Sequence, residues 1–268
     1  MSLISETFEH LADRNEAALI AYVTGGDPNI NSTKQIIPSL AEAGADIVEI
    51  GIPFSDPIAD GPTLQAAAGR ALKNRTTPAS VLQLVAEVKR RTTIPIVLLT
   101  YYNLIYRMGL ENFFESSERF GVDGVVVPDL PVEESVEYTK MADLHGVDTI
   151  FLAAPSTSNQ RLKRIATRSS GFLYLTSLYG VTGARRSLDR NLPRLITRTR
   201  RLARGLPVCV GFGISTADHV SKVTGAGARG AIVGSALVEL IAKYSSHKTF
   251  PAPLLRTVRG LKAATRPV

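Results

Sequence analysis

Apolar runs rich in β-branched residues recur at nearly even intervals along the 268-residue chain. The eight runs are Ala18–Val23, Asp46–Ile50, Ile94–Leu99, Val122–Val127, Asp148–Leu152, Gly171–Leu175, Pro207–Val210 and Gly230–Val233. Strands that are apolar on both faces indicate a parallel sheet covered by helices. Eight such strands in a chain of this length predict the α/β class, a (β/α)8 TIM barrel forming a single domain over residues 1–268. A doubly wound sheet is the alternative, but no Gly-x-Gly-x-x-Gly opens a helix after the first strand.

Segments with a helical spacing of apolar positions separate the strands. They are Ser32–Ala43, Ala79–Arg91, Leu110–Phe120, Val132–His145, Asn159–Arg168, Leu192–Arg204 and Thr216–Val223. The pattern predicts three kinds of addition to the barrel. An N-terminal helix over Leu3–Arg14 is expected to plug the barrel floor, a further helix over Leu64–Lys73 follows the second strand, and a helical stretch within Pro251–Val268 follows the helix after the eighth.

Composition places the chain among ordinary globular proteins, because 44% of its residues are hydrophobic and 21% are charged. No apolar run approaches the roughly 20 residues that a membrane span requires. The N-terminus lacks the charged and apolar segments of a signal peptide. The single Cys209 lies in an apolar run and is expected to be a buried thiol. These features predict a cytoplasmic protein without a membrane partner.

The net charge of +7 raises the question of a nucleic-acid partner. The densest basic stretch is Arg194–Arg204, where helical spacing puts Arg194, Arg198 and Arg201 on one face. No aromatic residues alternate with these arginines to stack on bases. The stretch is therefore interpreted as the solvated face of an outer helix, and no nucleic-acid partner is expected.

The residue that fits its surroundings least is Glu49, which lies inside an apolar strand. Removing an unpaired carboxylate from water costs several kcal/mol, or the group becomes neutral instead. The loop that follows is stiffened by three prolines and carries Asp56 and Asp60. An acid on a strand end and a second acid on a braced loop suit proton transfer. A buried ion pair for Glu49, and turn or helix-capping roles for the two aspartates, are the structural alternatives.

In barrels of this type the site lies at the carboxyl ends of the strands. Two of these ends carry glycines where an anion can reach backbone N–H groups: Gly211–Gly213 after the seventh strand and Gly234–Ser235 after the eighth. Ser235 opens a helix and can cap it. This pairing predicts a phosphate site, with tight turns as the alternative. The loop Ser177–Ser187 after the sixth strand contains two glycines and is expected to be a lid, or else an ordinary surface loop.

Metal chemistry is not expected. The four histidines, His10, His145, His219 and His247, fall in predicted helices or tails, and no cluster has ligand spacing. No lysine stands at a strand end, which argues against a Schiff base. With metal and Schiff-base chemistry disfavoured, the sequence predicts acid–base chemistry by carboxylates, without a metal, on a phosphorylated substrate.

The stretch Glu49-Ile-Gly-Ile-Pro-Phe-Ser-Asp-Pro-Ile-Ala-Asp-Gly-Pro62 resembles the tryptophan synthase α-subunit family. The resemblance extends over nearly the whole chain, and its supporting stretches are Tyr22–Pro28, Pro128–Glu134, Gly180–Gly183, Gly211–Ser215 and Gly234–Ser235. It implies a (β/α)8 barrel that cleaves indole-3-glycerol phosphate to indole and glyceraldehyde 3-phosphate by a retro-aldol reaction.

The resemblance also implies roles for individual residues. Glu49 corresponds to the family's acid/base, Asp60 to its partner acid, and Tyr174 to the tyrosine beside them. Tyr22, Leu99, Val126 and Phe212 would line the indole pocket, and Thr182 would hold Asp60 when the lid closes. Gly183, Gly213, Gly234 and Ser235 would bind the phosphate. Tyr22 is a departure, since phenylalanine is common at this position, and the arginine-rich helix and basic tail also look particular to this chain.

The family's α subunit docks on a β subunit in an αββα heterotetramer, where indole and L-serine become L-tryptophan. The resemblance implies partner contacts from the Pro53–Asp60 loop, including Pro53, Asp56 and Pro57, and from the segment around Asn103–Met108, including Asn103. It places pyridoxal phosphate in the β subunit alone, so no cofactor is expected in this chain.

Three other functions are weighed. Another metal-free barrel acting on a phosphorylated sugar is the first, and the synthase that forms indole-glycerol phosphate would be expected to carry a strand-end lysine. A non-catalytic regulatory subunit is the second, and the retention of both Glu49 and Asp60 argues against it. A free-standing lyase that releases indole is the third, and its chemistry would be the same.

Overall fold

Parallel strands form the centre of the molecule in the computed structural model, which describes residues 1–177, 188–246 and 251–266. Within these residues nine strands form one sheet in the order β5-β4-β3-β2-β1-β9-β8-β7-β6. The strands are β1 (Ala18–Thr24), β2 (Ile47–Gly51), β3 (Ile96–Leu99), β4 (Gly124–Val126), β5 (Asp148–Ile150), β6 (Leu152–Ala153), β7 (Leu173–Thr176), β8 (Val208–Gly211) and β9 (Gly230–Val233). Every pairing between them is parallel.

The barrel closes through a strand that is divided in two. The predicted run Asp148–Leu152 forms β5 and β6, with Phe151 between them. β5 pairs with β4, and β6 pairs with β7. β5 and β6 together therefore occupy the place of one strand in the barrel wall, and they connect β4 on one side with β7 on the other. The eight predicted runs and the (β/α)8 class are confirmed, and the ninth strand is this division.

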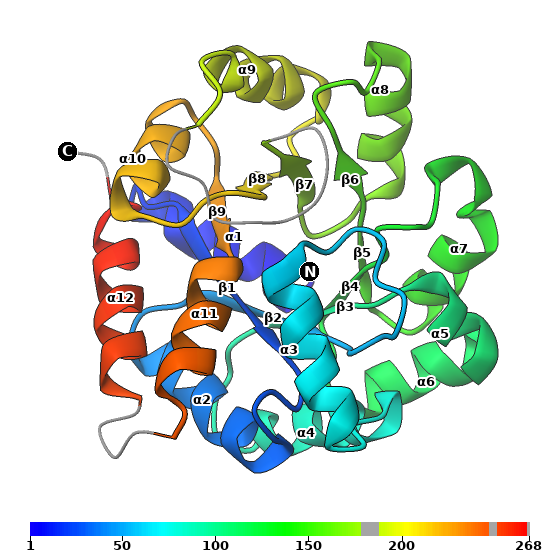
Figure 1. Cartoon of the computed structure of the whole chain (residues 1–268). Helices are drawn as coiled ribbons and strands as arrows, with labels where there is room; N and C mark the ends of the chain where they lie inside the picture. Colours follow the sequence, from blue (N-terminus) through cyan, green and yellow to red (C-terminus); the bar gives the residue numbers. More distant parts are fainter. Residues whose placement is uncertain (178–187, 247–250, 267–268) are drawn as a thin grey trace.

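Helices surround the strands on the outside (Figure 1). They are α1 (Leu3–Asp13), α2 (Ile30–Glu42), α3 (Pro62–Lys73), α4 (Pro78–Lys89), α5 (Tyr102–Met108), α6 (Leu110–Phe120), α7 (Val136–Leu144), α8 (Asn159–Arg168), α9 (Leu192–Leu202), α10 (Ala217–Gly225), α11 (Ser235–Tyr244) and α12 (Ala252–Ala263). The predicted helices are confirmed, including the additions after the second and eighth barrel strands. Two details are additional: the run Val132–His145 begins as the short 3-10 helix η1 (Val132–Glu134), and α5 lies in a segment for which no helix was predicted. None of the helices in the described residues is long and apolar enough to span a membrane.

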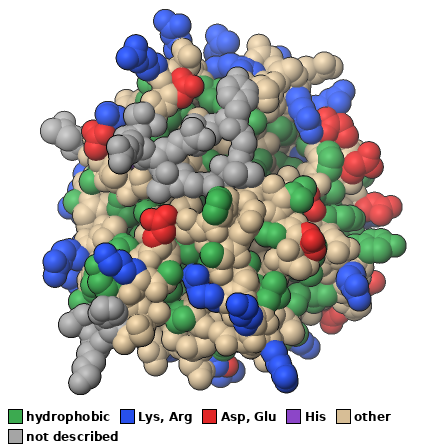
Figure 2. Space-filling model, viewed as in Figure 1, with side chains coloured by type: hydrophobic (Ala, Val, Ile, Leu, Met, Phe, Trp, Pro, Cys, Tyr) green, Lys and Arg blue, Asp and Glu red, His purple; other side chains and the backbone are tan. Residues whose placement is uncertain are grey.

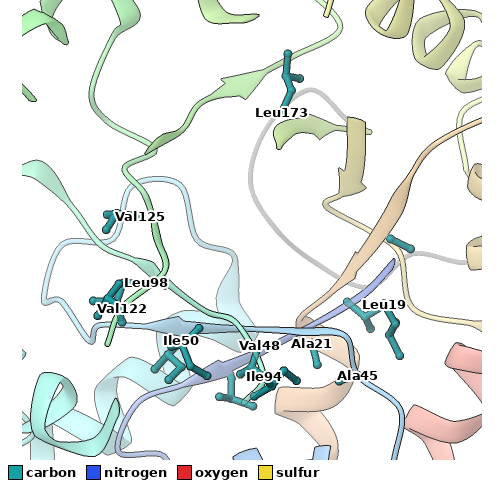
Figure 3. Close-up of a cluster of buried hydrophobic side chains, with 14 of the residues drawn as sticks. Leu19, Ala21, Ala45, Val48, Ile50, Ile94, Leu98, Val122, Val125 and Leu173 are labelled. Atoms are coloured by element: carbon teal, nitrogen blue, oxygen red, sulfur yellow. The ribbon is translucent and has the colours of Figure 1, made fainter. Parts of the chain in front are cut away.

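Alternation along the strands decides which side chains enter the barrel. Leu19, Ala21, Val48 and Ile50 belong to the large cluster between strands and helices, and Figure 3 shows them along β1 and β2. Ile47, one residue away from Val48, belongs instead to the cluster that fills the barrel. Glu49 shares the parity of Ile47, so its carboxyl points into the interior.

One end of the barrel is closed by α1, as predicted. Its buried residues Ile4, Phe8 and Leu11 belong to the cluster that fills the barrel. The ring centroids of Phe8 and Phe172 lie 6.0 Å apart. Ser2 caps this helix and also donates a hydrogen bond of 2.6 Å to Asp148. Because this end is plugged, a ligand can enter only from the opposite end, where the strands have their carboxyl termini.

Candidate active site

Glu49 is the most deeply buried acid at the open end of the barrel. It lies on β2 in register with Tyr22 of β1 and Val97 of β3, and it is 1% exposed. Among the described residues its Oε2 has no hydrogen-bond partner. Burial, and then the charge of Asp60, raise the pKa of Glu49 to about 8. The carboxyl is therefore largely protonated at neutral pH, and no cation in the described part of the chain forms an ion pair with it.

Asp60 reaches the same region from the loop between β2 and α3. It is 6% exposed, and its N–H donates a 3.0 Å hydrogen bond to Pro57 O. Burial raises the pKa of Asp60 to about 6, against the lowering effect of a hydrogen bond from the Tyr101 hydroxyl. Asp60 is therefore mostly ionised at neutral pH. The two neighbouring acids thus differ in protonation state, which is the arrangement that acid–base catalysis requires.

Tyr101 was not predicted as a site residue. It follows the third barrel strand and lies at the start of α5, where its hydroxyl accepts a 3.2 Å hydrogen bond from Ala59 N–H and bonds to the Asp60 carboxylate. Its ring also packs on Phe54, with the centroids 5.3 Å apart. Tyr101 therefore fixes the end of the loop that carries Asp60. Its position at a strand end was the one signal in the sequence, and the sequence does not show where the loop folds.

Two tyrosines flank Glu49, and each lies against a glycine of the neighbouring strand. A Cβ on Gly51 would stand 2.1 Å from the Tyr22 hydroxyl, and one on Gly211 would stand 2.5 Å from the Tyr174 hydroxyl. Any larger residue would collide with these rings. Burial raises the pKa of both tyrosines well above the ordinary value, so both hydroxyls stay neutral.

A cavity lies among these side chains at the carboxyl ends of the strands, with a free volume of about 30 Å³. Its lining includes eight predicted residues: Tyr22, Glu49, Leu99, Tyr174, Phe212, Gly213, Gly234 and Ser235. Leu64, Ile214 and Ile232 also line it and were not predicted. Val126 and Asp60 are buried but are not part of the lining. Ligand pockets usually measure about 300–1,000 Å³, so binding requires the side chains at the mouth to move apart.

The loop after β8 has an unusual backbone at the edge of this cavity. Phe212 has φ of 63° and Gly213 has φ of 99°. A positive φ is uncommon for phenylalanine, and surrounding contacts must hold it. Ser177 supplies two of them, since its hydroxyl donates to Phe212 O and its N–H donates to Gly211 O at 3.0 Å. The Phe212 ring stands edge-on to Tyr174, with the centroids 5.7 Å apart.

The N-terminus of α11 lies at the same edge of the cavity. Gly234 is its N-cap and Ser235 its first helical residue, and no side chain caps the helix. The prediction that Ser235 caps this helix is therefore wrong, because the N-cap position falls one residue earlier, on Gly234. The Ser235 side chain lines the cavity instead. The first N–H groups of a helix and a nearby hydroxyl form a favourable place for an anion.

The loop with Asp60 and the adjacent α5 form an exposed surface. Asp56 and Asn103 are exposed and Pro57 is partly exposed, whereas Pro53 is buried. Two large apolar side chains on this surface lie in the two segments from which partner contacts are expected. Ile58 is 74% exposed and Tyr106 is 75% exposed. Isolated exposed apolar residues are normal, but two of them close to the predicted interface residues favour a docking role for this surface.

Charge is distributed unevenly over the rest of the surface. Figure 2 shows basic side chains gathered over α8 and α9 and acidic ones over α7. Arg194 and Arg201 are exposed, while Leu192 and Ile196 of the same helix are buried. The prediction that the arginine-rich stretch is an outer helix is confirmed. Within the described residues, no group of three or more His, Cys, Asp or Glu side chains is arranged to hold a metal ion.

Thr182 and Gly183 belong to the predicted lid. Both lie outside the described residues, as do all positions from 178 to 187.

Comparisons with known proteins agree over almost the whole chain. A family model described as "Tryptophan synthase alpha chain" matches residues 8–266. The tryptophan synthase alpha chain of Prochlorococcus marinus is 44% identical over 241 residues, which cover 90% of this chain and 86% of that protein. That of Geobacter sp. strain M21 is 43% identical, covering 99% of this chain and 97% of that protein. A solved structure of the tryptophan synthase α2β2 complex from Pyrococcus furiosus superposes with a TM-score of 0.85 at 42% identity, covering 93% of this chain and 99% of that one.

Proposed function

The chain belongs to the tryptophan synthase alpha chain family, whose reaction is the cleavage of indole-3-glycerol phosphate, and from this premise we propose that Glu49 and Asp60 move the protons of that reaction. One observation carries the proposal. Glu49 faces a cavity with one carboxyl oxygen unbonded within the described chain, beside a second acid of lower pKa.

Glu49 acts first as the general acid. The bond between the indole ring and the glycerol chain breaks only after C3 of the ring has become sp³, so a proton must reach that carbon. A carboxyl whose pKa is about 8 holds this proton at neutral pH. Once Glu49 has given it up, the resulting carboxylate accepts the proton of the hydroxyl on the adjacent glycerol carbon. That hydroxyl carbon becomes the aldehyde of glyceraldehyde 3-phosphate as the C–C bond breaks and indole leaves.

Asp60 stabilises the ring nitrogen during the same step. Protonation at C3 makes the ring N–H more acidic, and an ionised carboxylate accepts its hydrogen bond. With a pKa of about 6, Asp60 is ionised under conditions in which Glu49 is still protonated. Turnover is therefore expected to rise as pH increases through about 6 and to fall as it increases through about 8.

The other predicted residues hold the substrate around these two acids. Tyr22, Leu99 and Phe212 line the cavity where the indole ring would lie, with Val126 behind them and Tyr174 beside Glu49. Gly213 and the α11 N-terminus at Gly234 and Ser235 would bind the phosphoryl group. As part of the proposal, Thr182 would hold Asp60 when the lid closes, and Gly183 would contribute to phosphate binding.

Docking on a β subunit completes the proposed function. The related complex from Pyrococcus furiosus is an α2β2 assembly. The exposed Ile58 and Tyr106, together with Asp56, Pro57 and Asn103, offer an apolar surface with a polar rim that suits such an interface. Pro53 is buried and would brace the loop from within. Pyridoxal phosphate would belong to the β subunit, this chain would use no cofactor, and the complex would be cytoplasmic.

The test is an assay of indole release from indole-3-glycerol phosphate, by the purified chain alone and with a β subunit. We expect weak activity that rises strongly when the β subunit is added. Asp60→Asn, which keeps the shape of the side chain and removes its charge, should lower turnover by a factor on the order of 10² or more. Near-normal turnover in this variant would refute the role of Asp60. Equal activity with and without the β subunit would favour a free-standing lyase.

A further inference from the structure

The backbone of Asp60 is held by a side chain that does not itself line the cavity. Gln65, in the first turns of α3, donates a 2.7 Å hydrogen bond from Nε2 to Asp60 O. Its own N–H donates to Gly61 O at 3.0 Å, as in any helix. One residue therefore binds two consecutive carbonyl groups, of Asp60 and of the Gly61 N-cap. This fixes the peptide plane between Asp60 and Gly61 relative to the helix axis.

Other bonds to Asp60 within the described chain do not link its main chain to a helix or strand. Its N–H bonds to Pro57 O, which belongs to the same loop and moves with it. Tyr101 binds the carboxylate and the neighbouring Ala59 N–H. Gln65 thus supplies the link between the main chain of Asp60 and a regular element.

The helix that carries Gln65 is itself firmly placed. Arg70 forms two hydrogen bonds, of 2.7 and 2.8 Å, with the buried carboxylate of Asp27 in the loop after β1. Leu64, Ala67, Ala68 and Ala71 bury the inner face of α3. A hydrogen bond to this helix fixes the main chain of Asp60 relative to the barrel, whereas a hydrogen bond within the loop does not.

We propose that Gln65 is a positioning residue for Asp60, which it holds through the main chain at the distance from the indole nitrogen that the reaction requires. The inference rests on the proposed function, because it concerns the acid assigned to the ring nitrogen. Misplacing a catalytic group by a fraction of an ångström weakens a hydrogen bond that matters in the transition state more than in the bound substrate. The loss of Gln65 therefore lowers kcat and leaves KM nearly unchanged.

Two substitutions of the exposed Gln65 distinguish a role in positioning Asp60 from a purely structural role. Gln65→Met keeps the length of the side chain and removes the donor, so kcat should fall about 5- to 10-fold with KM within about twofold. Gln65→Glu cannot donate while it is ionised and regains a donor when it is protonated. Its kcat relative to the wild type should therefore rise as pH falls toward about 4.5, while the same ratio for Gln65→Met stays flat.

Gln83, an exposed glutamine on α4, provides the matched control. Gln83→Met and Gln83→Glu should leave kcat, KM and the pH ratio at wild-type values. Wild-type kcat in Gln65→Met, or a flat pH ratio in Gln65→Glu, would overturn the inference even if Asp60→Asn is inactive and the proposed function stands. If the wild-type chain with a β subunit cleaves no indole-3-glycerol phosphate, the proposed function itself fails and the inference falls with it.

Discussion

Asp46 and Glu49 lie three positions apart in the chain, Asp46 just before β2 and Glu49 in the middle of it, and their surroundings differ. Asp46, at the floor, receives hydrogen bonds of 2.9 and 3.0 Å from Lys262 of α12 and one of 2.7 Å from Leu19 N–H. Lys262 also forms an ion pair of 3.1 Å with Glu16. Glu49, at the mouth, has neither a cation nor a donor on Oε2 in the described chain. Both acids are largely buried, and only the first is paired.

The pKa of each acid reflects this difference. Burial raises the pKa of Asp46, but Lys262 and Leu19 N–H oppose the rise. For Glu49 nothing opposes burial, and the charge of Asp60 adds to it, so its pKa reaches about 8. A paired buried acid connects elements of the fold. An unpaired one destabilises the fold at neutral pH and keeps a proton that it can transfer.

The strongest test of this contrast exchanges each acid for its amide. Glu49→Gln removes the transferable proton, so turnover should fall by a factor on the order of 10² or more while the fold persists. Asp46→Asn, three residues away, should leave turnover per folded molecule near the wild-type value. Steady-state indole release, normalised to the folded fraction, measures both. Comparable losses of turnover in the two variants would contradict the distinction between the paired acid at the barrel floor and the unpaired acid at its mouth.

The second test breaks the paired acid at the floor. Lys262→Met leaves the carboxylates of Asp46 and Glu16 without their shared cation, and removing one partner of a buried pair costs about 3 kcal/mol. Urea denaturation at pH 7 should show this loss of unfolding free energy. Because the lysine is far from the mouth, kcat of the folded fraction should not change. A drop in kcat would show that the floor affects the chemistry.

The third test asks whether the unpaired acid costs stability. The folded-state pKa of Glu49, about 8, lies above the ordinary value of 4.5, so the folded state binds a proton more tightly than the unfolded state does. The contribution of Glu49 to stability is therefore fully present below pH 4.5 and is lost as pH rises through about 8. Glu49→Gln lacks this loss and should be about 3–4 kcal/mol more stable than the wild type at pH 7–8. The difference should shrink toward zero near pH 4.5, and an advantage that does not vary with pH would contradict the explanation.

The smallest effect concerns two serines at helix starts. Ser158 caps α8 by accepting a 3.3 Å hydrogen bond from Arg161 N–H, whereas Ser235 caps nothing and lines the cavity. Ser158→Ala should lower stability by about 1 kcal/mol without changing KM. Ser235→Ala should leave stability nearly unchanged and raise KM about three- to fivefold, because it removes the proposed contact with the phosphoryl group. A KM effect in the first variant, or a stability effect in the second, would contradict these assignments.

Much of this arrangement follows from local pattern. The eight apolar runs predict the barrel, and the carboxylate inside the second run identifies Glu49 as a candidate site residue. The site of such a barrel lies at the carboxyl ends of its strands. Reading these ends in the sequence therefore identifies most of the residues that line the cavity, although the folding of the loops is unknown. What the sequence does not predict depends on how loops fold in three dimensions. The hydrogen bond between Tyr101 and Asp60, the exposure of Ile58 and the use of Gly234 as the N-cap of α11 are all of this kind.

The close fit between Gly51 and the Tyr22 ring has a consequence for how this site can change over generations. A methyl group at position 51 would lie 2.1 Å from the phenolic oxygen of Tyr22, 2.8 Å from its Cζ and 3.0 Å from its Cε2, so loss of the oxygen alone makes no room for alanine. Relatives with phenylalanine or tyrosine at position 22 should therefore both keep glycine at 51. A lineage must replace the whole ring at 22 by a smaller side chain before it can acquire the methyl group at 51.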